Sequence, residues 1–167
     1  MVEVIKGKVW KFGDNINTDL ICPGPLMRLP IDQIGKAAMA GIDPNFSQKI
    51  SKGDIIVAGE NFGSGSSREL APLALKKADI AAVVAEYFAR IFMRNCISIG
   101  FPLMACKGIS KKVEQGDVLQ INLATGKIEN LTKNETYDGW KFPKEFIEIF
   151  EAGGIIEWLK KHQEFIK

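Results

Sequence analysis

Between residues 54 and 106 the sequence alternates three short apolar runs with two longer helical patterns. The runs have the length and nearly continuous apolar character of strands that are buried on both faces. Strand, helix, strand, helix, strand is the order of parallel βαβ units, so this block restricts the chain to the α/β class. The predicted strands are DIIVAGE (54–60), AAVVAE (81–86) and FPLMAC (101–106), and the predicted helices are 67–78 and 87–100.

The sequence before this block is less regular. The stretch LICPGPLMRLPID (20–32) has three prolines within eight residues, so we expect an extended loop without regular structure there. The other segments expected are a strand or hairpin at 2–12, a polar loop at 13–19, a short helix at 31–42 ended by Gly41, and a connector at 43–54.

The last third of the chain has a different pattern. DVLQINLATGKIENLT (117–132) alternates as a hairpin with a Thr-Gly turn at 125–126. Residues 141–163 read as two short helices, broken by the glycines at 153–154. We therefore expect a single α/β domain over 1–167, with a largely parallel core sheet flanked by helices, plus a C-terminal hairpin and helices.

Charge and hydropathy exclude several classes of function. The 167 residues carry a formal net charge of +2, which gives no reason to expect nucleic acid or an anionic membrane as a partner. No apolar run approaches the roughly 20 residues that span a bilayer. The charged N-terminus MVEVIKGKVWKFGD lacks the apolar stretch of a signal peptide, so we expect a cytoplasmic protein.

Cysteine and histidine are scarce. Cys22, Cys96 and Cys106 are widely spaced, which favours reduced thiols over a disulfide framework. The only histidine, His162, lies close to the C-terminus. A Ser-His-Asp triad or a histidine metal site is therefore not expected within this chain.

The segment GENFGSGSSRELAPLAL, from residue 59, carries the strongest chemical signal. It leaves the carboxyl end of a predicted strand and enters a predicted helix, where ligands collect in open α/β sheets. Gly63 and Gly65 allow close backbone approach, and Ser66 or Ser67 is expected at the helix N-cap. Arg68 adds a planar positive fork, so the segment predicts a site for a carboxylate or phosphate.

Other interpretations of this segment remain open or fail on spacing. The serines could be plain helix caps, with Arg68 an ordinary surface residue. A P-loop requires Gly-Lys followed by Ser or Thr, and a nucleophile elbow requires G-x-S-x-G; the segment has neither. The residues alone therefore support an α/β domain with an anion site.

Two further clusters are candidates for the same site. The first comprises Asn17-Thr18-Asp19 and the proline-stiffened loop that ends in Leu26-Met27-Arg28-Leu29. A stiff loop loses little entropy on binding, which suits substrate recognition. The second comprises Arg90, Arg94 and Asn95 in a predicted helix, where surface arginines are also common.

Three motifs in this order carry a resemblance to a known family. GDNINTDLICPGP, GENFGSGSSRELAPLAL and YFARIFMRNCISIGFPL together resemble the small subunits of 3-isopropylmalate dehydratases, which share their unit with the swivel domain of the aconitase superfamily. The resemblance implies a swivelling β/β/α fold and a large partner subunit, in a heterodimer or heterotetramer. It also implies that a [4Fe-4S] cluster on the partner polarises the substrate hydroxyl, and that this chain binds no cluster or metal.

The resemblance also assigns roles to single residues. Ser66 matches the serine that removes the proton from the carbon next to a carboxylate, while Gly65, Ser67 and Arg68 would bind the substrate. The loop of Leu26, Met27 and Arg28 matches the segment that selects the substrate side chain. Leu26 replaces a tyrosine common in relatives, and Leu70 replaces the usual His or Gln. The flanking apolar side chains suit an isopropyl or methyl group, whereas the arginine suits a further carboxylate.

We therefore expect the small subunit of a hydro-lyase that converts 2-isopropylmalate to 3-isopropylmalate in leucine biosynthesis. Homoaconitate, 2-methylmalate or citraconate, and dimethylmalate remain alternative hydroxy-dicarboxylate substrates. A non-catalytic module that binds carboxylate or phosphate is the alternative from another class. The isolated chain could also self-associate through the surface meant for its partner.

Overall fold

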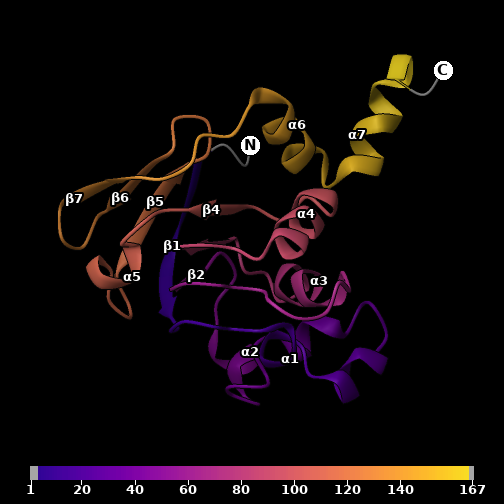
Figure 1. Ribbon diagram of the computed structural model, residues 1–167, viewed down its shortest axis with the longest axis horizontal. Coiled ribbons are helices and arrows are strands. Elements are labelled where there is room, and N and C mark those ends of the chain that lie inside the picture. Colours follow the sequence, from indigo (N-terminus) through magenta and orange to yellow (C-terminus); the bar gives the residue numbers. More distant parts are fainter. Residues whose placement is uncertain (1–3, 166–167) are drawn as a thin grey trace.

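The computed structural model describes residues 4–165 and arranges them around a seven-stranded mixed sheet (Figure 1). The strand order is β4-β3-β2-β1-β5-β6-β7; β1 to β4 are mutually parallel, and β5 to β7 continue the sheet in antiparallel pairs. The α/β class with a parallel core is therefore confirmed. The strands are β1 (Val4–Lys11), β2 (Ile55–Ala58), β3 (Ala82–Ala85), β4 (Leu103–Ala105), β5 (Val118–Asn122), β6 (Lys127–Asn130) and β7 (Glu135–Asp138).

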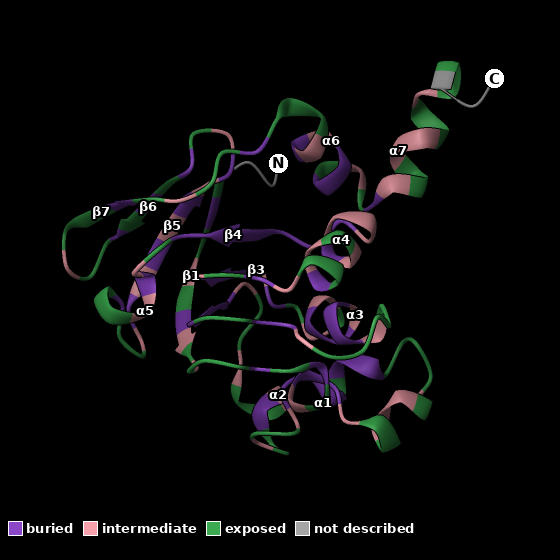
Figure 2. Ribbon diagram, in the orientation of Figure 1, coloured by how far each residue is buried: buried purple, intermediate pink, exposed green. Residues whose placement is uncertain are grey.

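Burial follows the two kinds of sequence pattern. Every residue of β2, β3 and β4 is buried, as expected for the continuous apolar runs (Figure 2). In β5 and β6, buried residues alternate with less buried ones, which matches the alternating sequence. The strands β2 to β4 are thus enclosed by other elements, whereas β1 and the antiparallel strands β5 and β6 keep one face less buried.

The helices that follow the core strands lie where the sequence predicts them. α3 joins β2 to β3 and α4 joins β3 to β4, so each connects neighbouring parallel strands. Of the other α-helices, α6 is as long as α4, α7 has seven residues, and α1, α2 and α5 are single turns of four residues. The α-helices are α1 (Thr18–Ile21), α2 (Phe46–Lys49), α3 (Leu70–Lys77), α4 (Arg90–Ser98), α5 (Ile109–Lys112), α6 (Lys144–Ala152) and α7 (Ile155–Lys161), and the 3-10 helices are η1 (Gly24–Arg28), η2 (Ile34–Ala37) and η3 (Gln163–Phe165).

Several predictions for the segment before β2 are wrong. α1 starts inside the predicted polar loop, and α2 lies inside the predicted connector. The proline-rich stretch does contain regular structure, because Pro25 occupies the first turn of η1, where its missing N–H and fixed φ are tolerated. The helix predicted at 31–42 shortens to the single 3-10 turn η2. Ala38 leaves the helical region with ψ 122°, and Met39 follows with φ +54°.

The predicted C-terminal hairpin is a three-stranded meander, because β7 pairs with β6. Sequence analysis missed β7 since Tyr137 is its single buried residue. The turn between β5 and β6 is confirmed, with Gly126 at φ +75°. The break between α6 and α7 is also confirmed, with Gly153 and Gly154 both at positive φ.

Lys76 ties three helices together on one side of the sheet. From α3, its ammonium donates to the carbonyl oxygen of Ile99, at the end of α4, and to that of Gly153, at the end of α6, the latter at 3.1 Å. A cation at two helix C-termini complements both dipoles. Within residues 4–165 no helix has both the length and the apolar composition required to cross a membrane.

Candidate active site

The site is built where β1 and β2 end. These strands are parallel neighbours, with Val9 opposite Ile55, so the loops that follow them leave the same edge of the sheet side by side. The two loops are joined by backbone hydrogen bonds. The N–H of Asn15 donates to the carbonyl oxygen of Glu60 at 2.8 Å, and the N–H of Gly63 donates to that of Ile16 at 2.7 Å.

An aromatic cluster fixes the start of the loop after β2. Phe62 packs edge-on against Phe88 and Phe92, with ring centroids 5.9 and 5.3 Å apart. Gly63 has φ +85°, and a Cβ there would lie 2.1 Å from the Phe92 ring. The glycine therefore lets the loop pass directly over the aromatic cluster before it reaches the serines.

Ser66 is not the N-cap of α3, and neither is Ser67; that prediction is wrong. The helix begins at Leu70 with Glu69 as its N-cap, and no side chain caps it. Instead, the Ser66 hydroxyl oxygen accepts a hydrogen bond from the backbone N–H of Arg68 at 3.2 Å. Ser66 therefore forms a local side-chain turn in front of the helix, with its hydroxyl exposed.

The three sequence clusters converge on this loop. Thr18, after β1, accepts a hydrogen bond from the Ser66 N–H at 3.0 Å. Asn95, on α4, donates from its side-chain amide to the Ser67 carbonyl oxygen at 2.9 Å. The Arg68 guanidinium donates to the Met27 sulfur at 3.3 Å. We call Gly65, Ser66, Ser67, Arg68 and Met27 the site rim.

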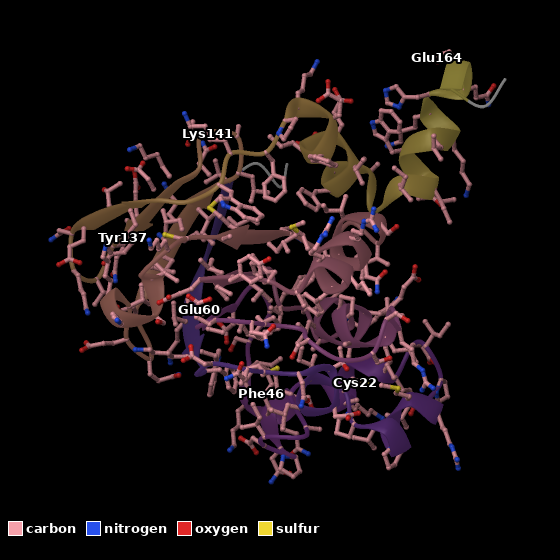
Figure 3. The ribbon with its side chains drawn as sticks, in the orientation of Figure 1. Cys22, Phe46, Glu60, Tyr137, Lys141 and Glu164 are labelled. Atoms are coloured by element: carbon pink, nitrogen blue, oxygen red, sulfur yellow. The ribbon has the colours of Figure 1, made fainter. Side chains whose placement is uncertain are left out.

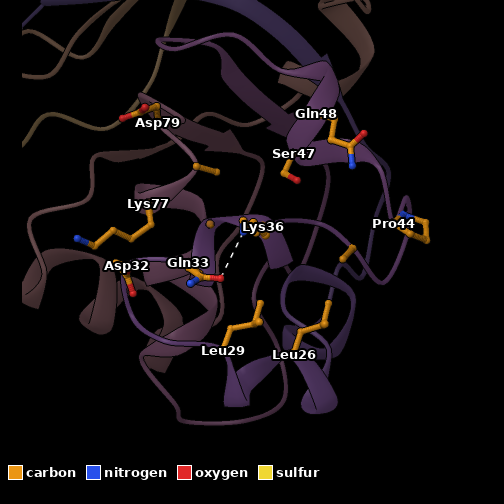
Figure 4. Close-up of a pocket in the computed structure, with 13 residues that line it drawn as sticks. Leu26, Leu29, Asp32, Gln33, Lys36, Pro44, Ser47, Gln48, Lys77 and Asp79 are labelled. Carbon is orange, nitrogen blue, oxygen red and sulfur yellow. Dashed lines mark hydrogen bonds between the residues drawn. The ribbon is translucent and has the colours of Figure 1, made fainter.

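Leu26 points away from the loop. Leu26 and Leu29 turn into a groove of about 890 Å³ that η1, η2, α2 and the end of α3 enclose, and the rim residues do not line it (Figure 4). Arg28 is exposed and has no recorded hydrogen bond or ion pair among the described residues. Of the three predicted selector residues, only Met27 therefore contacts the loop of Ser66.

The arginines of this chain have no acidic partner among residues 4–165. The chain has four arginines, and all of them are exposed: Arg28, Arg68, Arg90 and Arg94. The recorded salt bridges among residues 4–165 involve lysines or His162, and none involves an arginine. Arg68, which lies in the loop itself and has no acidic partner, therefore suits an anionic ligand.

The thiols do not suit an iron–sulfur cluster. Cys22, Cys96 and Cys106 are free, buried and located on separate elements, with Cys22 beside α1 (Figure 3). Burial raises the pKa of Cys22 and Cys106, and raises that of Cys96 well above its ordinary value. Across the described part of the chain, no three His, Cys or acidic side chains gather in a way that could hold a metal ion.

The lone histidine belongs to the C-terminal helix rather than to the site. His162 stacks on Trp158 with ring centroids 4.2 Å apart, and its Nδ1 lies 2.9 Å from the Trp158 carbonyl oxygen. α7 projects from the body at the end beyond α6 (Figure 1). The chemistry of the rim must therefore rely on hydroxyl, backbone and guanidinium groups.

Sequence analysis placed Thr18 and Asn95 in candidate clusters but assigned them no contact. Their roles depend on which strands are neighbours, because β1, β2 and β3 deliver Thr18, Ser66 and Asn95 to one edge. A prediction that β1, β2 and β3 are neighbours in the sheet would have placed both contacts.

Comparison with known proteins shows the family of this chain. Residues 31–107 match the model of the aconitase C-terminal domain. The chain is 54% identical over 162 residues to the isopropylmalate/citramalate isomerase small subunit of Methanocaldococcus jannaschii, covering 96% of both chains. It is 48% identical over 159 residues to the 3-isopropylmalate dehydratase small subunit of a Hydrogenobaculum species, covering 94% of this chain and 96% of the relative.

A solved structure supports the same relationship. The crystal structure of 3-isopropylmalate dehydratase from Methanocaldococcus jannaschii superposes with a TM-score of 0.89 and 42% identity, covering 97% of this chain and 96% of that one. Fold and site thus define an aconitase-type swivel domain. Within that class, the chain belongs to the family of 3-isopropylmalate dehydratase small subunits.

Proposed function

We propose that this chain is the small subunit of a hydro-lyase that converts 2-isopropylmalate to 3-isopropylmalate by dehydration and rehydration, a reaction of leucine biosynthesis. The observation that carries the proposal is the exposed Ser66 hydroxyl, fixed beside an unpaired Arg68 in a member of this family. The name of one relative also includes citramalate. Isomerisation of that 2-methyl analogue is therefore a second candidate activity.

Ser66 acts as the base in this proposal. It takes the proton from the carbon next to a substrate carboxylate, the electron pair of the C–H bond moves toward that carboxylate, and hydroxide leaves the neighbouring carbon. A serine hydroxyl is a weak acid, so its anionic form requires nearby donors. The Arg68 N–H already donates to Ser66 Oγ, and this bond strengthens when the oxygen carries charge.

Arg68 binds the substrate carboxylate, together with backbone groups of Gly65 and Ser67. Its planar fork matches a carboxylate, and its recorded side-chain partner is the weakly accepting sulfur of Met27. A carboxylate is a much stronger acceptor, so the guanidinium can exchange partners at little cost. Arg68 is thus available to bind substrate and to stabilise the charge that develops on its carboxylate.

Met27 supports a small apolar substrate group. Its side chain contacts the carboxylate-binding Arg68, so an isopropyl or methyl group bound beside that arginine would meet a thioether. Leu26 contributes only if η1 rearranges, because it now lines the groove with Leu29. Arg28 lies on the same 3-10 helix and selects among substrates from the outer side.

The remaining chemistry belongs to a partner. The term small subunit in the relatives' names implies a large subunit. The buried, separated thiols of this chain do not fit a [4Fe-4S] cluster, so we assign the cluster and the Lewis acid for the departing hydroxyl to the large subunit. The two chains form a heterodimer or heterotetramer in the cytoplasm.

The test is an anaerobic assay of this chain reconstituted with its large subunit. Wild type should turn over isopropylmalate, citramalate or both, and Ser66→Ala should lower kcat by at least about 1000-fold while the complex still forms. Ser98→Ala, at the end of α4, is the matched control and should retain activity. Arg28→Ala should change the preference between the two substrates more than it changes total activity.

Two results would contradict the proposal. Turnover by Ser66→Ala within about tenfold of wild type would show that Ser66 is not the base. A wild-type complex with an intact cluster that turns over no hydroxy-dicarboxylate would leave a carboxylate- or phosphate-binding module as the function of the rim.

A further inference from the structure

Thr18 makes two hydrogen bonds to the loop of Ser66, one on each side of Gly65. Its backbone N–H donates to the Ser64 carbonyl oxygen at 2.8 Å, and its Oγ1 accepts from the Ser66 N–H at 3.0 Å. The two bonds enclose Gly65. Thr18 is itself only 3% exposed at the start of α1, so its position is set by the core rather than by solvent.

Gly65 makes this close approach possible. It has φ +110°, a conformation that side chains disfavour, and a Cβ there would lie 3.0 Å from Thr18 Oγ1. Residues 65–69 are all exposed, so the loop has little packing of its own to restrain it. The bonds from Thr18 therefore carry much of the restraint on the peptide before Ser66.

The restraint passes directly to the proposed base. The Ser66 amide is bound to Thr18, and the Ser66 hydroxyl oxygen is bound to the N–H of Arg68. On the far side, Asn95 binds the Ser67 carbonyl oxygen. Ser66 is thus fixed through its own amide and its own Oγ, and Thr18 is the buried member of this set.

We propose that Thr18 is a positioning residue for the reaction, which acts through the Ser66 amide to aim the Ser66 hydroxyl at the substrate. The inference rests on the proposed role of Ser66 as the base. Thr18 touches no substrate in this proposal. Its loss misplaces the base without removing a binding group, and a displacement on the order of 1 Å costs about 100-fold in rate.

The kinetic test uses the reconstituted complex with Thr18→Val, Thr18→Ser and Thr132→Val. Valine keeps the shape of threonine but cannot accept the Ser66 N–H, so kcat should fall at least about tenfold while KM stays within about threefold. Thr18→Ser keeps the acceptor oxygen, so its kcat should stay within about threefold of wild type. Thr132→Val is the matched control, because Thr132 Oγ1 accepts the Val118 N–H at 2.9 Å in the antiparallel half of the sheet.

A second readout needs no partner subunit and no cluster. NMR amide exchange on the isolated chain should show the Ser66 N–H exchanging several-fold faster in Thr18→Val than in wild type, because its acceptor is gone. The thermal midpoint should shift no more than it does in Thr132→Val. Thr18→Ala tests the same loss if valine is not accommodated.

The outcomes separate this inference from the proposed function. Normal kcat in Thr18→Val, equal losses in the valine and serine variants, or unchanged Ser66 exchange would each overturn the role of Thr18. An inactive wild-type complex would instead overturn the role of Ser66, and the exchange experiment would still decide whether Thr18 holds the loop.

Discussion

The two halves of the sheet use polar side chains in opposite ways. In the antiparallel half, the buried Asp117 carboxylate accepts from the Asn130 side-chain amide at 2.7 Å and from the Glu114 N–H at 3.0 Å. The exposed Lys127 and Asp138 pair at 2.6 Å. At the site rim, beyond the carboxyl ends of the parallel strands, the Arg68 guanidinium has no acidic partner among residues 4–165 and donates only to the Met27 sulfur.

This difference indicates which half carries function. Polar groups in the antiparallel half bind one another, so they stabilise the fold and have little left to offer a ligand. Groups at the rim leave part of their hydrogen-bonding capacity open, which costs some stability and makes binding possible. Variants at the rim should therefore change activity without changing stability, and variants in the antiparallel half should do the reverse.

Among the variants that compare the two halves, Arg68→Ala should give the largest effect. The variant loses the guanidinium proposed to bind the substrate carboxylate. The kcat/KM of the reconstituted complex should therefore fall by about 100- to 1000-fold, roughly 3–4 kcal/mol. The free energy of unfolding should change by less than about 0.5 kcal/mol, since the recorded side-chain partner of Arg68 is the Met27 sulfur. Steady-state kinetics and urea unfolding measure the two quantities.

Arg68→Lys sharpens the same test. It keeps the charge and loses the planar fork, so its kcat/KM should lie between those of wild type and the alanine variant. A large loss of stability in either variant would show that Arg68 is structural and would undo the contrast between the two halves.

Asn130→Ala should give the opposite result. Asn130 is 1% exposed, donates to Asp117, and accepts from the N–H groups of Thr132 and Lys133 at 3.1 Å each. Its loss leaves buried partners unsatisfied and should destabilise the fold by about 2–4 kcal/mol. The urea midpoint should fall at constant m-value, while kcat of the folded complex stays near that of wild type.

Asn45→Ala is the control for this experiment. Asn45 is exposed and its side chain does not cap α2, so its truncation should leave the midpoint almost unchanged. Equal midpoints for the two alanine variants would show that the Asn130 network contributes nothing to stability.

Asp117 gives the antiparallel half a pH-dependent contribution to stability. Burial alone would raise the pKa of this carboxyl, but the hydrogen bonds from Glu114 and Asn130 and the charge of Lys133 lower it below 3.8. A lowered folded-state pKa means that the stability is present above this ordinary value and is lost as pH falls through the folded pKa. The gap in unfolding free energy between wild type and Asp117→Asn should therefore narrow as pH falls from about 5 to 3. A gap that is constant over this range would contradict the assignment.

The sequence predicted the parallel half of the fold better than the rest. The strands within the predicted runs, 55–58, 82–85 and 103–105, are fully buried, and that environment tolerates few patterns other than a continuous apolar one. β7 escaped prediction because one buried residue, Tyr137, gives no periodicity. η1 escaped because a proline in a first turn looks the same in sequence as a proline that prevents a helix.

The site was predictable in composition but not in geometry. The Gly/Ser segment predicts an anion site through its residue types, and its position after a strand places it at a sheet edge. The bond from Ser66 to Thr18 joins residues 48 positions apart, so it depends on the strand order. The opposite orientations of Leu26 and Met27 depend on the 3-10 turn that the prolines were expected to prevent.

Lys127→Ala should give the smallest effect and sets the lower limit of the comparison. Its ion pair with Asp138 is short, but both side chains are more than half exposed, so water and salt screen the attraction. The free energy of unfolding should fall by about 0.5 kcal/mol or less, with kcat unchanged. In the wild type, the hydrogen bond from Lys127 lowers the pKa of the Asp138 carboxyl. The small difference in stability between wild type and variant should therefore vanish in acid, where this carboxyl is protonated, and in high salt, where the charges are screened. A loss of unfolding free energy comparable to that of Asn130→Ala would show that exposed ion pairs also stabilise this half of the sheet. Burial would then not explain which polar groups stabilise the fold and which are free to bind a ligand.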